Sequence, residues 1–208
     1  MSSNSVTIVG RSSSHFTRTL RMLAHELDVP YSLAPLYDLG SRAVADYAGN
    51  PALKIPILVT EDGPWFGALS AARELARRAR SPARIVWPEQ VKDRLASNAQ
   101  ELVLSAMATE VQVLMGNAAG ASELPKARAS LVGSLEWLEQ HMPAALAQTE
   151  RADAVSYLAI TTFCLVTHLH FRQVLDTTPF AGLCDFCAAF GERASARATE
   201  YRFDAPPA

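Results

Sequence analysis

Three consecutive serines, residues 12–14, stand where a short apolar run gives way to a helical pattern. Residues 6–9 have the length and residue types of a β-strand, and from Phe16 onward apolar residues recur at helical spacing. A serine at such a boundary can cap the first turn of the helix. Its hydroxyl can also donate a hydrogen bond to a thiolate, a charge that the positive end of the helix dipole stabilises. Both roles are open to these serines.

The segment NPALKIPILV, residues 50–59, combines two features that conflict. Residues 57–59 are apolar and rich in β-branched side chains, which is typical of a buried strand. Pro56, directly before them, has no N–H for a sheet and is confined to edges, bulges and strand starts. Pro56 is therefore either a trans proline in a loop or a bend at the start of a strand.

Other groups that could do chemistry favour structural roles. Cys184 and Cys187 have C-x-x-C spacing, but a zinc site needs about four ligands and no second pair is present. We interpret both as core cysteines on one helix face. His168 is expected to pack or to face solvent. Glu110 lies in the apolar stripe of a long helix, where we expect it to pair with an arginine, the alternative being contact with a substrate. No metal site is predicted.

Composition excludes several classes of function. The chain has 208 residues, 49% of them hydrophobic and 19% charged, with a formal net charge of −2. The balanced charge indicates neither a nucleic-acid partner nor a membrane surface. Three cysteines form no disulfide framework, and the N-terminus lacks the pattern of a signal peptide, so we expect a cytoplasmic protein.

The chain divides at a linker, residues 80–84, into two expected domains. Residues 1–80 have the pattern β-α-β-α-β-β-α, with a weak short helix at 39–47. Residues 84–208 have no clear strand pattern and are expected to form an all-helical domain. We expect its helices near the following residues: 95–113, 131–142 (ended by Pro143), 153–171 and 183–193. Residues 203–208 are expected to fray.

This arrangement resembles the glutathione S-transferase (GST) superfamily, in particular divergent bacterial members of the serine type. Residues 50–59 resemble the family segment Asn-Pro-x-x-x-Val-Pro-x-Leu, residues 152–154 its Ala-Asp-Ile motif, and residues 193–195 its closing Arg-Pro-Ser. The resemblance implies an N-terminal thioredoxin-like domain followed by a C-terminal α-helical bundle. It also implies that Pro56 is cis and that the backbone of Ile55 pairs with the cysteine of glutathione.

The resemblance assigns roles to particular residues. Ser14 would be the catalytic residue, a donor that stabilises the thiolate, with Ser12 as the next candidate. The family's acidic-Ser pair, which binds the γ-glutamyl group, is replaced by Ala68 and Leu69. The implied glutathione contacts are Ser12, Phe16, Lys54, Ile55, Pro56, Ala68, Leu69 and Ser70. The implied pocket for a second substrate consists of Met107, Glu110, Val111 and Leu114, whose alternative role is core packing.

The implied function is that of a transferase in detoxification. Glutathione would be the co-substrate, without a metal, and its thiolate would attack a small hydrophobic electrophile. The protein would be a homodimer, as the family is. Loss of the acidic-Ser pair motivates an alternative, a non-catalytic binding or interaction protein with a degenerate glutathione site; we favour the enzyme.

Overall fold

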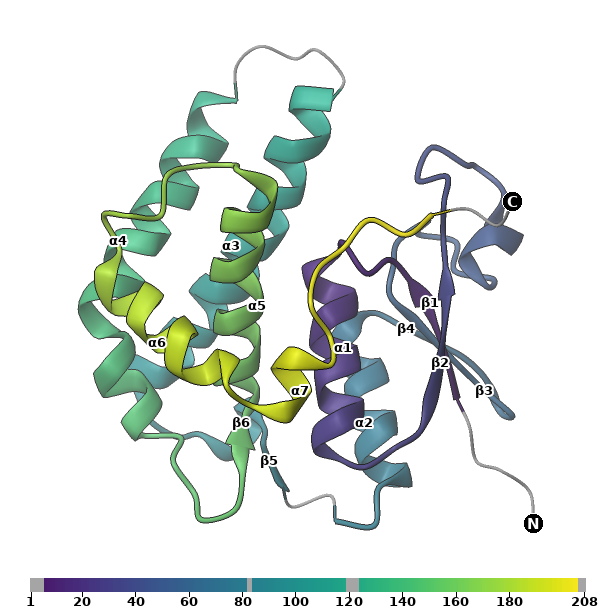
Figure 1. Ribbon diagram of the computed structural model, residues 1–208, viewed down its shortest axis with the longest axis horizontal. Helices are drawn as coiled ribbons and strands as arrows, with labels where there is room; N and C mark the ends of the chain where they lie inside the picture. Colours follow the sequence, from purple (N-terminus) through teal and green to yellow (C-terminus); the bar gives the residue numbers. More distant parts are fainter. Residues whose placement is uncertain (1–5, 82–83, 119–123, 206–208) are drawn as a thin grey trace. The chain divides into compact units, whose positions relative to one another are not determined.

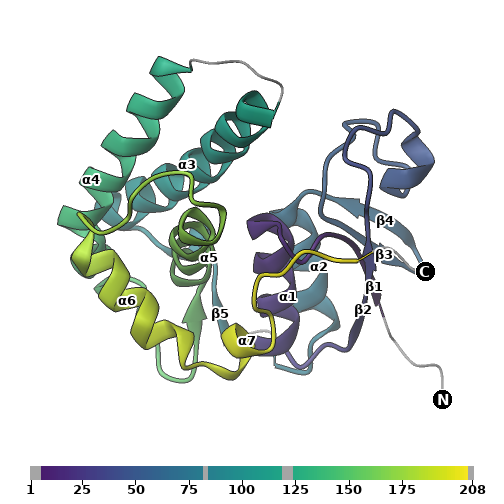
Figure 2. The same cartoon turned by 45° about the horizontal axis from the view of Figure 1, so that its top comes forward.

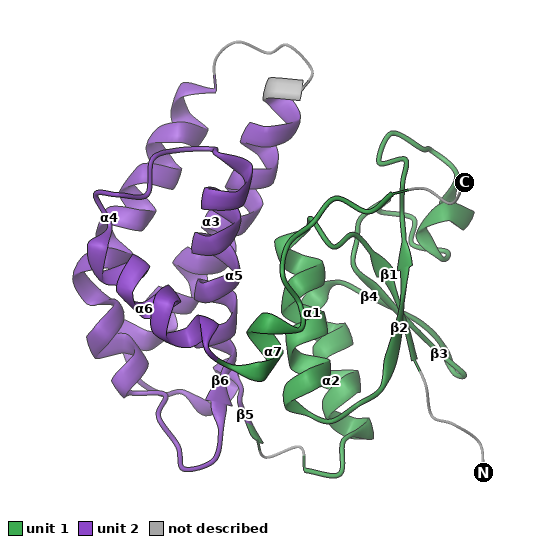
Figure 3. Cartoon of the chain, in the orientation of Figure 1, with its two compact units in different colours: residues 1–84, 193–208 green, residues 85–192 purple. Residues whose placement is uncertain are grey.

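The computed structural model describes residues 6–81, 84–118 and 124–205, so residues 82–83 of the expected linker lie outside the description. The chain forms two compact units, shown in Figure 3: Met1–Arg84 with Arg193–Ala208, and Ile85–Glu192. The expected division assigned all of residues 84–208 to one helical domain. The structure instead groups the last residues of the chain with the first unit.

The first unit contains a four-stranded sheet with the order β2-β1-β3-β4 (Figure 1). Strand β1 pairs in parallel with β2 and antiparallel with β3, and β3 pairs antiparallel with β4. A 3-10 turn, η1, occurs within the segment where a weak helix was expected. The elements are β1 (Val6–Gly10), α1 (His15–Glu26), β2 (Tyr31–Pro35), η1 (Val44–Tyr47), β3 (Ile57–Thr60), β4 (Gly63–Phe66) and α2 (Ala68–Arg78).

Burial explains why these segments adopt their structures. Val6 and Ile8 alternate with less buried residues along β1, and both are almost completely buried. Leu20 and Leu23, three residues apart on α1, are fully buried, so one face of this helix belongs to the core. Figures 1 and 2 both show α1 and α2 side by side on the same face of the sheet. This is the thioredoxin-like arrangement that the sequence predicted.

The second unit consists mainly of four long helices and one short pair of strands. Helix α5 is buried along nearly its whole length, as the sequence predicted for a central helix. No helix in the described parts of the chain is long and apolar enough to cross a membrane. The elements are β5 (Ile85–Val86), η3 (Pro88–Gln90), α3 (Arg94–Ala118), α4 (Pro125–Ala147), β6 (Val155–Ser156), α5 (Tyr157–Arg172) and α6 (Ala181–Gly191).

Three expectations for this unit were wrong. Helix α4 continues past Pro143 to Ala147. Met142 and Ala145, on either side of the proline, are almost completely buried, so tertiary packing keeps this stretch helical although the proline has no N–H to donate. Helix α5 begins at Tyr157, and its first turn is capped by Ser156, whose hydroxyl accepts from the Ala159 N–H. The residues before it form β6, which pairs in parallel with β5 and is too short to leave a strand pattern in the sequence.

The chain returns to the first unit at Arg193, and we call residues 193–204 the C-terminal segment. Figures 1 and 2 both show it, in yellow, running along α1. At the C-terminal end of α1, Arg193 donates two hydrogen bonds to the Glu26 carboxylate, at 2.9 and 2.8 Å. The hydroxyl of Ser195 donates to the same carboxylate at 2.5 Å. One acidic side chain therefore anchors the start of the C-terminal segment, including the short helix α7 (Ala194–Arg197).

Two arginines of α1 hold the middle of the C-terminal segment. Arg18 donates to the Ala196 carbonyl at 3.1 Å, and its guanidinium lies 4.3 Å from the centre of the Tyr201 ring. Arg21 donates to the Ala198 carbonyl at 3.5 Å. Both arginines are 4% exposed, so these contacts form away from solvent and the segment is fixed over several turns of α1.

We predict that Glu26→Gln weakens the fold in a pH-dependent way. Partial burial raises the pKa of Glu26, but the hydrogen bonds from Arg193 and Ser195 outweigh it and hold the pKa below its ordinary value. Such a group stabilises the fold above its ordinary pKa, and this stability is lost as pH falls through the folded value. Because Arg193 is well exposed, we expect the variant to lose only about 1 kcal/mol at pH 7.

Urea unfolding of both proteins from pH 7 to pH 3 measures this effect. The difference should shrink as pH falls below the ordinary pKa of 4.5. Asp185→Asn, which removes an exposed carboxylate with no hydrogen-bond partner in the described residues, is the control and should change little. A loss that stays constant across this range would contradict the role assigned to the Glu26 charge.

Candidate functional site

The strand register brings three connections of the first unit to one edge of the sheet. Val9, near the end of β1, lies opposite Ile57 at the start of β3, and Ile57 lies opposite Phe66 at the end of β4. The β1–α1 turn, the residues before β3 and the start of α2 must therefore emerge at the same edge. These are the places where most of the predicted glutathione contacts stand.

The predicted proline bend is confirmed. The Ile55–Pro56 peptide bond is cis, and β3 begins only at Ile57, so Pro56 precedes the ladder in which an N–H is needed. The preceding loop is held by Asn50, which donates to the Lys54 carbonyl at 2.8 Å. The backbone N–H and C=O of Ile55 form no hydrogen bond within the described residues. Both groups can therefore pair with an extended ligand, while Lys54 is exposed.

Ser14 occupies the N-cap position of α1. Its Oγ accepts a hydrogen bond from the Thr17 N–H at 3.3 Å. This contact uses a lone pair of the oxygen and leaves the hydroxyl proton for another acceptor. Ser14 and the neighbouring Phe16 are half-buried. The two roles considered for this serine, helix cap and ligand donor, are therefore compatible in one side chain.

Ser12 differs from Ser14 in both burial and partners. It is fully buried, and its Oγ has no hydrogen-bond partner in the described part of the chain. Its backbone N–H donates to Oδ2 of Asp204 at 2.7 Å. Residues 203–208 were expected to fray, which is wrong for Asp204; residues 206–208 lie outside the description. No local signal could have found Asp204, because it lies 192 residues away from Ser12 along the chain.

The start of α2 offers backbone donors but no acid. Gly67 is its N-cap, with φ of 79° and no side-chain capping bond. Ala68 and Leu69 are half-buried and Ser70 is exposed, so the N–H groups of the first turn can receive a carboxylate. Glu74, the acidic residue of this helix, binds Arg77 and Arg78 at 2.7 Å each. It is therefore not free to replace the missing acidic-Ser pair.

The predicted second-substrate residues lie on α3 in the second unit. Met107 is fully buried, Leu114 is half-buried and Val111 is 39% exposed. The full burial of Met107 favours core packing, the alternative that the sequence left open. Their assignment to a substrate pocket stays a prediction.

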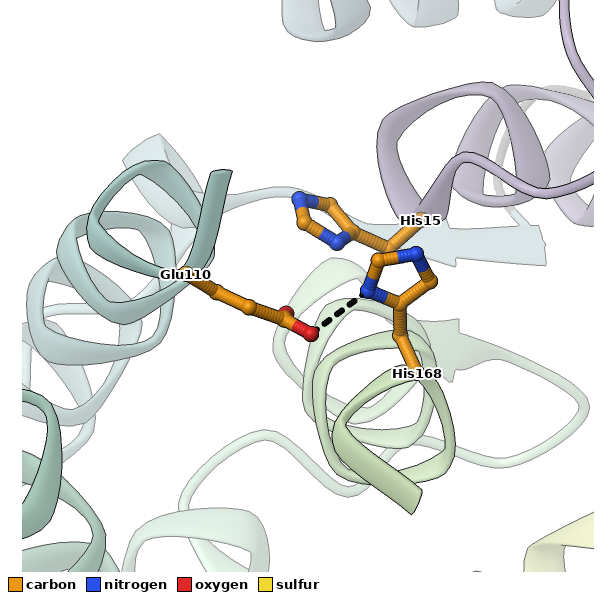
Figure 4. Close-up of side chains that lie close together, drawn as sticks. All are labelled: His15, Glu110 and His168. Carbon is orange, nitrogen blue, oxygen red and sulfur yellow. Dashed lines mark hydrogen bonds and ion pairs between the residues drawn. The ribbon is translucent and has the colours of Figure 1, made fainter. Parts of the chain in front are cut away.

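Glu110 is paired as expected, but with a different partner. Its Oε1 lies 2.7 Å from Nδ1 of His168 on α5, within the second unit (Figure 4). Both side chains are almost completely buried. The partner that the structure gives is thus a histidine of the same unit, where the sequence had suggested an arginine. Of the two expectations for His168, packing is the one that its burial supports. His15, also drawn in Figure 4, belongs to the first unit.

The cysteines form no disulfide within the described ranges. Cys187 on α6 is buried, and half-buried Cys184 donates a weak hydrogen bond to the Thr177 carbonyl at 3.5 Å. The interpretation of a core cysteine is confirmed for Cys187, while Cys184 is only partly covered.

No protein-family model matches the sequence. The uncharacterized GST-like protein YibF of Escherichia coli (strain K12) is 28% identical over 173 residues, which cover 80% of this chain and 83% of YibF.

Solved structures extend the likeness over almost the whole chain. A glutathione transferase family member from Pseudomonas fluorescens Pf-5, with bound glutathione, has a TM-score of 0.75 and 21% identity, covering 95% of this chain and 99% of its own. A glutathione S-transferase from Methylobacterium radiotolerans JCM 2831, in complex with glutathione sulfonate, has a TM-score of 0.74 and 15% identity, covering 98% and 99%.

The chain therefore has the glutathione S-transferase fold, a thioredoxin-like unit and a helical unit. The resemblance to this superfamily that the motifs indicated is confirmed at the level of the fold, and most of the chain is similar in sequence to a GST-like protein.

We predict opposite stability effects for the two serines of the turn. Ser14→Ala removes the acceptor for the Thr17 N–H and should lower the free energy of unfolding by about 1 kcal/mol. Ser12→Ala removes a buried hydroxyl that has no partner, so it should change that free energy by less than about 0.5 kcal/mol. Urea unfolding of the two variants beside the wild type measures the difference. Equal losses would show that Ser14 is not the cap.

We also predict the effect on stability of removing the buried pair Glu110 and His168. Glu110→Leu should cost about 3 kcal/mol, since it leaves His168 without this buried partner. The double variant Glu110→Leu/His168→Leu should be more stable than the sum of the two single changes predicts. A double-mutant cycle from urea unfolding gives the coupling. Additive losses would mean that the bond at 2.7 Å contributes no coupling energy.

Proposed function

We propose that the protein binds glutathione at the sheet edge of its first unit and conjugates the glutathione thiolate to a small hydrophobic electrophile. The observation that carries this proposal is the meeting of three features at one edge: the Ser14 turn, the cis bend at Ile55–Pro56 and the uncapped start of α2. A tripeptide with a thiol and terminal carboxylates needs a donor for the thiolate, a backbone partner and an anion site.

Each feature supports one step of binding or chemistry. The backbone of Ile55 would pair with the cysteine of glutathione, and the N–H groups at Ala68 and Leu69 would receive the γ-glutamyl carboxylate. Ser14 would donate its hydroxyl proton to the thiolate at the N-terminus of α1, where the helix dipole also favours negative charge. Only the thiolate is nucleophilic, so this donor would raise the reactive fraction of bound glutathione.

A second candidate is a binding protein without catalysis. Ala68 and Leu69 carry no acid or hydroxyl for the γ-glutamyl group, and Glu74 is engaged by arginines. Losing a charge-assisted hydrogen bond costs about 1.5–3 kcal/mol, which corresponds to roughly tenfold or more in affinity. Weak binding of glutathione, with no turnover, is what this candidate predicts.

The proposal also covers the protein's compartment, oligomeric state and role. The protein would act in the cytoplasm as a homodimer, in the detoxification of electrophiles. The exposed apolar residues Val111 and Met115 on α3 and Val132 on α4 support a covered surface on the second unit.

The proposal predicts that calorimetry detects reduced glutathione with a millimolar or tighter dissociation constant near neutral pH. With an activated aryl halide as electrophile, Ser14→Ala should lower the turnover number about tenfold or more, since the thiolate loses its donor. Ser12→Ala tests the other candidate serine of the same turn and should lower the turnover number less. Binding without turnover would favour the second candidate. No heat at tens of millimolar would contradict both.

A further inference from the structure

The second unit carries a hollow of about 460 Å³ between α4 and the connection from α5 to α6. Figures 1 and 2 both show this connection leaving α5 and crossing to the side of α4. The volume lies within the range of about 300–1,000 Å³ that is usual for small-molecule sites. Its apolar wall is formed by Val132 on α4 and by Leu175, Pro179 and Phe180 on the connection. We call it the α4 hollow.

Hydrogen bonds fix the walls of the α4 hollow. Both carboxylate oxygens of Glu139 on α4 accept backbone N–H groups at the start of α6, from Gly182 at 2.7 Å and from Leu183 at 2.9 Å. Within the connection, Asp176 accepts the Thr178 N–H at 3.0 Å and the Thr178 hydroxyl at 2.8 Å. The hollow is therefore formed before any ligand enters, which lowers the ordering cost of binding.

The charged side chains that line the α4 hollow all have the same sign. They are Glu136, Glu139 and Asp176, and none of them forms an ion pair with another described residue. The positive end of α6 offsets the charge of Glu139, whereas Glu136 and Asp176 are exposed. The hydrogen bonds from Thr178 hold the pKa of the Asp176 carboxyl below its ordinary value, so it is ionised at neutral pH. A concave surface of one sign concentrates ligands of the opposite charge.

We propose that the α4 hollow binds small organic cations, in which an ammonium group is joined to an apolar or aromatic body. The body covers the exposed side chain of Val132 and the half-buried Leu175. The ammonium group faces Glu136 and Asp176. A neutral ligand of the same shape gains only the apolar contact, and an anion is repelled. This site uses none of the residues proposed to bind glutathione, so it goes beyond the proposed function.

The test compares phenethylamine, phenethyl alcohol and phenylpropionate. They share a ring on a short chain and carry a positive charge, no charge and a negative charge at neutral pH. Proton–nitrogen NMR titrations of the whole protein follow the amide signals of residues 175–183. We expect phenethylamine to shift these signals with a millimolar dissociation constant, about three- to tenfold tighter than the alcohol, and phenylpropionate to bind more weakly than both.

Charge-removing variants identify the groups that select the cation. Asp176→Asn keeps an acceptor for the Thr178 N–H, and Glu136→Gln removes the other exposed charge. Each should lower the ratio of amine to alcohol affinity about twofold, and the double variant should abolish most of the preference. Glu101→Gln removes an exposed carboxylate from α3 of the same unit and is the matched control, which should leave the ratio unchanged. Val132→Ser should weaken the binding of both ligands and keep the ratio.

The titrations decide between selection by charge and other binding. Equal affinity for the amine and the alcohol, or a preference that survives in the double variant, overturns the proposal. Shifts confined to other parts of the chain, or no shifts at tens of millimolar ligand, overturn it as well. Urea unfolding of each variant verifies that it is folded. Because glutathione takes no part in these titrations, their failure leaves the proposed function to its own calorimetric test.

Discussion

The attachment of the C-terminal segment to α1 is the constraint on which the candidate site depends. Glu26, Arg21 and Arg18 bind successive parts of the segment from one end of the helix to the other. Because the two arginines are buried, their guanidinium groups need acceptors, and the carbonyl groups of the segment supply them. The last contact of this series reaches Ser12, so the end of the chain and the β1–α1 turn hold each other.

Strand register sets the other half of the geometry. Pairing of Val9 with Ile57 and of Ile57 with Phe66 aligns three connections at one edge of the sheet. A shift of one residue would turn the buried side chains of β1 and β3 toward the opposite face. Along β1 the buried residues Val6 and Ile8 alternate with less buried ones, so this strand fixes the register, and the register fixes where the three connections meet.

Acidic side chains are unevenly placed around this edge of the sheet. The start of α2 offers N–H groups without an acidic neighbour, and Glu74 is held by Arg77 and Arg78. The carboxylate of Asp204 lies instead at the β1–α1 turn, where it accepts the Ser12 N–H.

The sequence by itself determined the order of strands and helices in the first unit, the proline bend at Pro56 and the serines that precede α1. These depend on residue types within a few positions of one another, which is the range over which periodicity and capping act. It could not identify the partner of Glu110, the continuation of α4 past Pro143 or the place of Asp204. Only the tertiary structure decided these, because each depends on which distant segments are buried against one another. Between Ser12 and Asp204 that separation is 192 residues.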